Sequence, residues 1–177
     1  TQTALEDNTS EKLGIGGVKS EKGSEVTKKE VSFKTATETV VRSVGADIDG
    51  NAANGSENIL YQPGNVIAVP NITGNYVTAS RIIVTLDEAV DKTTLTSSSV
   101  KLKDVTTGKF LSVEASAPVA AQPNLIAIKV VGINDYLTPR NSYQLVLDGV
   151  KAANGNTVEA FAFDFSYKVA QPTLTTA

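Results

Sequence analysis

The chain has 177 residues, 41% hydrophobic and 20% charged, an ordinary globular composition that argues against wholesale disorder. Its net charge of −3 argues against nucleic-acid binding, which needs a basic surface, and no apolar stretch is long enough to span a membrane. Cys and His are both absent, which excludes disulfides and thiolate metal sites and removes the commonest general base.

Residues 1–36 begin with a polar segment and continue as a predicted β-hairpin. Leu13–Val18 is rich in glycine and suits a short strand that ends in a turn, and Val31 and Phe33 mark a return strand. A two-stranded hairpin alone is marginal in water. These strands must therefore pack on the next domain, pair with another molecule or be disordered. Thr35–Glu38 is expected to be a linker.

Residues 37–168 contain a succession of short apolar alternations, with turn signals between them, and residues 169–177 are expected to be a tail. Some seven to eight short antiparallel strands predict an all-β sandwich. No convincing helix is expected, although a single turn fits within Leu86–Leu95. The predicted strands are Val40–Val44, Val66–Val69, Arg81–Asp87, Val100–Lys103, Phe110–Ala115, Ile126–Val130, Tyr143–Leu147 and Phe161–Phe165.

An internal repeat links the two ends of the chain. Gly17-Val18-Lys19 recurs as Gly149-Val150-Lys151, at an offset of 132 residues. Three further residues recur at the same offset: the turn glycine, the valine that opens the next strand, and the phenylalanine of that strand (Phe33 and Phe165). Repeats of this kind indicate copies of one structural unit. Residues 1–36 are therefore predicted to be the terminal strands of a preceding domain, a partial copy of the domain that follows.

The segment Gly45–Gly64 is the least strand-like part of the second domain and is predicted to be a long loop. It carries Asp47, Asp49, Asn51 and Glu57, oxygen ligands of the kind that Ca²⁺ prefers. The spacing departs from an EF-hand, which requires glycine at its sixth position and glutamate at its twelfth. Two interpretations stay open: a Ca²⁺ loop of another geometry, or an Asp/Asn/Gly turn that holds no ion.

A second acidic cluster comprises Asp87, Glu88 and Asp91, where a strand leaves the sheet. Paired carboxylates can serve a glycosidase, but the chain has no Trp to line a sugar cleft, so a solvated rim is expected. The chain has many Ser and Thr residues but no His or Cys to act with them in nucleophilic catalysis. No catalytic residue is predicted.

Three motifs, in order, resemble those of the bacterial Ig-like domains found in surface-layer (S-layer) proteins. The first is Arg81–Leu95, the second is the Leu-x-Pro-x-x-x-Tyr pattern of Leu137–Tyr143, and the third is the Gly-Val turn at Gly149–Val158, followed by Phe165. Leu86 stands where the family usually has phenylalanine in the first motif.

This resemblance implies an Ig-like β-sandwich with a structural role and no enzymatic activity. The expected function is that of a module in a self-assembling lattice on the bacterial cell wall, and Ca²⁺ dependence of that lattice stays open with the two interpretations of the acidic loop. Its partners would be other copies of itself and flanking domains of the parent protein, outside the cell. The alternative is a spacer or binding module of an extracellular adhesin or of a secreted polysaccharide-active enzyme.

Overall fold

The computed structural model describes residues 10–25, 27–34, 38–51, 58–65, 71–73, 80–117, 121–132 and 137–168. The chain divides into two compact units, and the division falls between Glu38 and Thr39. Within the described ranges, no helix has the length and apolar character needed to cross a membrane.

The first unit contains an antiparallel hairpin of β1 (Ser10–Ile15) and β2 (Lys29–Lys34). Leu13 lies opposite Val31 in the register, and every second residue shares a face. One face therefore carries four large apolar side chains. They are Leu13, Ile15, Val31 and Phe33, and all four are exposed.

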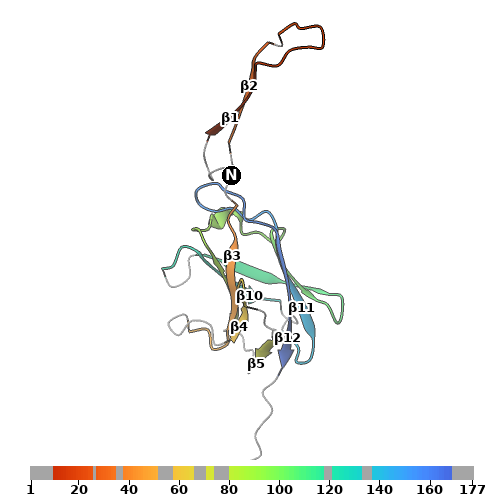
Figure 1. The fold of residues 1–177 in the computed structure, drawn as a ribbon. Coiled ribbons are helices and arrows are strands. Elements are labelled where there is room, and N and C mark those ends of the chain that lie inside the picture. Colours follow the sequence, from red (N-terminus) through yellow and green to blue (C-terminus); the bar gives the residue numbers. More distant parts are fainter. Residues whose placement is uncertain are drawn as a thin grey trace, which may run out of the picture. The chain divides into compact units, whose positions relative to one another are not determined.

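The second unit is a sandwich of two five-stranded sheets (Figure 1). The first sheet has the order β4 (Asn58–Tyr61), β3 (Val41–Asp47), β6 (Arg81–Leu86), β10 (Leu125–Val130) and β9 (Val113–Ser116). The second has the order β5 (Asn71–Thr73), β12 (Phe161–Lys168), β11 (Ser142–Leu147), β7 (Val100–Asp104) and β8 (Phe110–Leu111). All neighbours are antiparallel except β5 and β12, which run parallel. The predicted all-β sandwich is confirmed.

The strand count is higher than the predicted seven to eight. The segment Phe110–Ala115, predicted as one strand, forms two: β8 pairs with β7, and β9 pairs with β10 in the other sheet. The chain changes sheets at Ser112, so alternation continues in the sequence while the pairing partner changes. Short edge strands such as β5 have three residues, too few for a periodic signal.

The predicted long loop Gly45–Gly64 is partly wrong. The strand β3 continues through Gly45 to Asp47 and pairs with β4 on one side and β6 on the other. Gly, Ala and Asp have low strand propensity, but pairing on both sides overrides that preference. Residues 58–61 of the same segment form β4. The strand predicted at Val66–Val69 lies outside the described residues.

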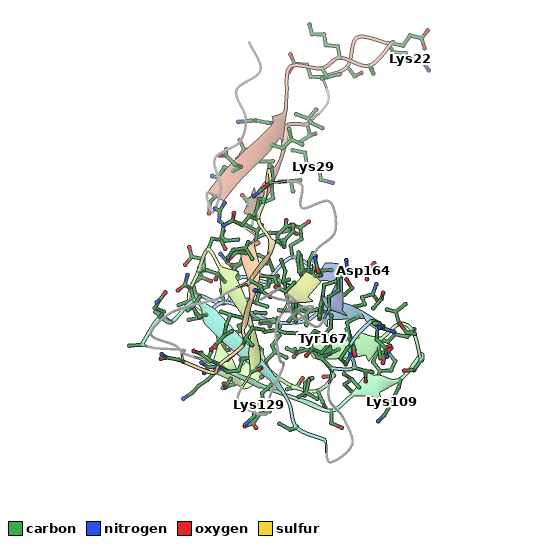
Figure 2. The ribbon with its side chains drawn as sticks, turned by 90° about the horizontal axis from the view of Figure 1, so that it is seen from below. Lys22, Lys29, Lys109, Lys129, Asp164 and Tyr167 are labelled. Carbon is green, nitrogen blue, oxygen red and sulfur yellow. The ribbon has the colours of Figure 1, made fainter. Side chains whose placement is uncertain are left out.

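The core lies between the sheets and is built mostly from the inward rows predicted from the alternation. Tyr143, Leu145 and Leu147 of β11 are fully buried. The aromatic row of β12 also faces inward, and its Phe165 ring stacks on Tyr143 with centroids 5.5 Å apart. Figure 2 labels two residues of β12: Tyr167 is buried, whereas Asp164 is exposed, as period two requires.

The predicted single turn within Leu86–Leu95 is a 3₁₀ helix at Lys92–Thr94. Asp91 caps it, because its carboxylate accepts hydrogen bonds from the backbone N–H of Thr93 (3.0 Å) and from its hydroxyl (2.7 Å). These hydrogen bonds from Thr93 hold the pKa of the Asp91 carboxyl below its ordinary value.

Candidate functional site

Asp47, the first residue of the predicted Ca²⁺ loop, is completely buried at the end of β3. Its Oδ1 accepts a hydrogen bond from the backbone N–H of Gly50 (2.7 Å), and its Oδ2 accepts from Nε of Arg81 (3.0 Å) and from the guanidinium Nη2. The same Nη2 donates to the carbonyl of Gly50 (3.0 Å). Asp47 and Arg81 face each other in the β3–β6 register, so the ion pair closes the turn that follows β3.

Asp49 and Asn51 of the predicted loop meet in the turn that follows β3. Asp49 is exposed and accepts a hydrogen bond from the backbone N–H of Asn51 (2.7 Å), within its own turn. Glu57 lies outside the described residues. In the part of the chain that the structure describes, no group of three or more His, Cys, Asp or Glu could hold a metal ion. A cation at Asp47 would have to displace a guanidinium, so the geometry favours the turn interpretation.

The second acidic cluster does not form a catalytic pair of carboxylates. Asp87 accepts a hydrogen bond from the backbone N–H of Val40 (2.9 Å) and lies 3.7 Å from a guanidinium nitrogen of Arg42. Asp91 caps the 3₁₀ helix, and Glu88 is exposed. The two aspartates therefore hold neighbouring segments of backbone in place.

Sequence reasoning missed a polar network at the end of β7. Asp104 is buried and accepts hydrogen bonds from the backbone N–H of Thr107 (2.9 Å) and from the side-chain amide of Asn141 (2.8 Å). Burial by itself raises the pKa of Asp104, but these hydrogen bonds outweigh it, and the pKa lies below its ordinary value. The alternation Val100, Leu102, Asp104 could have indicated an inward carboxylate, since an inward charge requires partners.

The Leu-x-Pro-x-x-x-Tyr motif has a structural explanation. Leu137 is buried, and Arg140 adopts a left-handed backbone conformation with φ of 75°. The hydroxyl of Tyr143 then reaches back to Thr138, where it accepts from the backbone N–H (2.6 Å) and donates to the carbonyl (3.2 Å). Burial raises the pKa of Tyr143, so its phenol stays protonated and can donate. The arrangement is of the tyrosine-corner type known in β-sandwiches.

A groove of about 460 Å³ opens at the edge of the sandwich where β7, β8 and β9 meet. Val100, Leu102 and Val113 form its apolar floor, and Phe110 stands at its rim with 59% of its surface exposed. A smaller groove of about 210 Å³ shares Val100 and Val113 and extends to Glu114. Exposed apolar surface of this kind is typical of a contact surface.

Basic side chains and unpaired strand edges surround the groove. The Nζ of Lys103 lies 5.8 Å from the centroid of the Phe110 ring, and Lys109, the exposed residue that precedes Phe110, is labelled in Figure 2. Within the described sheets, β8 and β9 each pair with a neighbour on one side only. An edge strand offers unpaired N–H and C=O groups to another chain. The groove and its two edge strands together are named the β8–β9 edge.

No protein-family model matches the chain. A curated S-layer protein of Geobacillus stearothermophilus is 27% identical over 176 residues, which cover 99% of the chain. The chain is similar to an S-layer protein. It spans only 12% of the length of that relative. Because the aligned residues make up 99% of the chain, this similarity confirms the resemblance inferred from the motifs.

Solved structures of one S-layer protein also align with the chain. The structure of the N-terminal part of the bacterial S-layer protein SbsC aligns with 75% of this chain, and the aligned part is 24% of the SbsC chain. The identity is 16% and the TM-score is 0.47. A structure of domains 1–6 of SbsC also aligns with 75% of this chain, and the aligned part is 14% of that SbsC chain. The identity is 17% and the TM-score is 0.48.

Proposed function

We propose that this chain is a structural, non-catalytic module of a bacterial surface layer, exposed outside the cell as part of a longer protein. The observation that carries this proposal is the 27% identity to an S-layer protein along 99% of the chain. The chain spans 12% of the length of that relative, so the proposal concerns this segment alone.

The use of the acidic side chains supports a structural role. Asp47, Asp87, Asp91 and Asp104 each accept a backbone N–H hydrogen bond, and thus each carboxylate stabilises a turn, a cap or a strand end. An enzyme instead needs polar groups that converge on a position for substrate. Two packed sheets whose turns are held by carboxylate–backbone hydrogen bonds form a rigid domain, and a rigid domain suits a load-bearing module.

We place the lateral contacts between neighbouring copies at the β8–β9 edge. That edge combines an exposed aromatic residue, Phe110, with an apolar floor and two strand edges that lack an outer neighbour among the described residues. Each contact can be weak, because a lattice engages many at once.

Sedimentation of residues 1–177 over a range of concentrations tests this assignment. We expect the unmodified chain to self-associate and Phe110→Asp to shift the association to at least about 10-fold higher concentration, since a charge would replace an exposed ring that the contact between copies would bury. Ile59→Asp is the matched control, because Ile59 is also exposed (47%) but lies in β4 at the opposite edge of its sheet.

Two outcomes would contradict the proposal. Equal effects of Phe110→Asp and Ile59→Asp would remove the assignment to the β8–β9 edge. A chain that stays monomeric at millimolar concentration and binds glycans would favour the alternative, a binding module of an adhesin or of a polysaccharide-active enzyme.

A further inference from the structure

The hairpin β1–β2 repeats the register of the closing hairpin β11–β12. Ser10 pairs with Lys34 as Ser142 pairs with Ser166, and all six pairs of β1–β2 follow those of β11–β12 at the offset of 132 residues. A slip of one residue would have moved every side chain to the other face. The two hairpins are therefore the same element with the same faces.

The turns of the two hairpins also match. The bridge Lys19–Glu25 corresponds to Lys151–Thr157. The backbone hydrogen bond from Ser20 to Ser24 (2.8 Å) corresponds to that from Ala152 to Asn156 (2.9 Å). Glycines with positive φ stand at equivalent places, with φ of 80° at Gly23 and 88° at Gly155. Figure 2 shows Lys22 at the tip of the first turn and Lys29 where β2 begins.

The two hairpins differ in burial. Leu13 is 59% exposed, whereas its equivalent Leu145 is completely buried. Phe33 is 42% exposed, whereas Phe165 is 3% exposed. Ile15 and Val18 are likewise exposed, and their equivalents Leu147 and Val150 are fully buried. The first hairpin thus presents an apolar face whose counterpart forms part of a core.

The second unit shows what covers such a face. The outer edge of β11 pairs with β7, antiparallel, and the outer edge of β12 pairs with β5, parallel. The apolar face of β11–β12 packs in one core cluster with Ile82, Val84 and Ile128 of the opposite sheet. Among the described residues, β1 and β2 pair only with each other.

We propose that the apolar face of β1–β2 is the docking surface for a β-sandwich body of the same type as residues 38–141, one that lacks a closing hairpin of its own. That body supplies an antiparallel strand to β1, a parallel strand to β2, and an aliphatic sheet that covers Leu13, Val31 and Phe33. A second copy of this chain is not the occupant, because its own β11–β12 fills the equivalent place. The inference does not rest on a surface-layer role, since a spacer would use the same surface.

Two substitutions within the repeat define the specificity of this surface. Glu11 stands at the position of Tyr143, and Lys29 at that of Phe161. The two charges lie at diagonally opposite ends of the shared face. The cognate body must leave the position of Lys29 open to solvent or offer it a charged partner, because burial of an unpaired charge is unfavourable.

A fused protein tests the docking directly. Residues 38–141 are joined in front of residues 10–177, so that Ser10 follows Asn141 as Ser142 does in the native chain. We expect a second cooperative unit in calorimetry, with the unfolding enthalpy rising about twofold. We also expect the β1–β2 amides to exchange at least about 100-fold more slowly than in the unfused chain, because a hairpin alone is marginal.

Two matched variants of the fused protein locate the surface. Leu13→Asp with Phe33→Asp changes the apolar face and should abolish the second unit. Lys12→Asp with Ser32→Asp changes the opposite face of the same pair of strands and should leave it intact. The native sandwich, residues 39–168, serves as the internal reference in every variant.

A further variant separates a failed fusion from a wrong docking surface. Glu11→Tyr with Lys29→Phe restores the aromatic residues of the closing hairpin, so it removes the charge mismatch as a reason for failure. If neither this variant nor the parent fused protein gains a second unit while residues 39–168 stay folded, the hairpin is not a docking surface of this kind. Self-association of the unfused chain that Leu13→Asp abolishes would also overturn it, since a second copy would then be the occupant.

Discussion

At the scale of single residues, the two buried carboxylates of this sandwich, Asp47 and Asp104, are each engaged by defined partners. Asp47 is held by Arg81 and the backbone of Gly50, and Asp104 by Asn141 and the backbone of Thr107. A buried charge is tolerated only when it is paired and hydrogen-bonded. These contacts make the acidic residues sensitive to substitution although none is predicted to be catalytic.

Asp47→Ala should lower the free energy of unfolding by about 3 kcal/mol, because it leaves the Arg81 guanidinium without its carboxylate in a largely buried site. Denaturant unfolding in EDTA measures this loss. Asp49→Ala, at an exposed position where the carboxylate accepts a hydrogen bond from the backbone of Asn51, should cost about 1 kcal/mol or less. A loss at Asp47 that occurs only in the presence of Ca²⁺ would contradict this account and support the Ca²⁺ loop.

Tyr143→Phe should lower the free energy of unfolding by about 1–2 kcal/mol, because it removes both hydrogen bonds to Thr138 while the ring stays stacked on Phe165. Chemical denaturation at neutral pH measures the change. Tyr167→Phe offers a comparison at a second buried tyrosine, whose backbone rather than its hydroxyl is bonded to Arg140 and Asn141 of the corner. An unchanged midpoint for Tyr143→Phe would show that the corner contributes nothing to stability.

Asp104 should make the domain less stable in acid. Its pKa is lower in the folded state than in the unfolded chain, so its contribution is complete above the unfolded pKa and is lost as the pH falls through the folded pKa. Asp104→Asn should therefore cost about 1–2 kcal/mol at pH 7 and progressively less below about pH 4. Urea unfolding of the unmodified chain and of Asp104→Asn at a series of pH values measures the loss of stability in acid and the cost of the substitution. A cost that does not change with pH would contradict the assignment.

At the scale of elements, the two hairpins show that burial depends on context and not on sequence pattern. Leu13 and Leu145 occupy equivalent positions in equivalent registers, yet only Leu145 lies in a core. Alternation identifies the apolar face of a strand, but it does not say whether anything covers that face.

Leu145→Ala should therefore lower the free energy of unfolding of the sandwich by about 3 kcal/mol, the cost of a cavity in a packed core. Leu13→Ala in the same chain should change it by less than about 0.5 kcal/mol, because Leu13 is exposed. Thermal or denaturant unfolding of both variants makes the comparison. A large cost for Leu13→Ala would show that the hairpin face is already covered in the free chain.

At the scale of the whole molecule, the first question is whether Ca²⁺ acts on the chain. With Asp47 paired to Arg81, we expect the melting temperature of residues 1–177 to be the same in EDTA and in millimolar Ca²⁺. Asp49→Ala with Asn51→Ala is the control. A Ca²⁺-dependent rise in melting temperature that this double variant loses would support the Ca²⁺ loop predicted from the sequence, and sedimentation in both buffers would show whether assembly follows.

Features that arise from local sequence patterns could be predicted from the sequence, whereas features that arise from contacts between distant strands could not. Period-two rows, turn glycines and the repeat at 132 residues are local patterns, so the sequence by itself determined the all-β class, most inward rows and the equivalence of the two hairpins. It did not place β4 or extend β3 to Asp47, because pairing with strands far along the chain overrides the weak propensity of Gly45 and Ala46. It also could not show that Asp47 meets Arg81, 34 residues away, or that Phe110 borders an open groove. Those features depend on which strands become neighbours, and only the tertiary structure decides that.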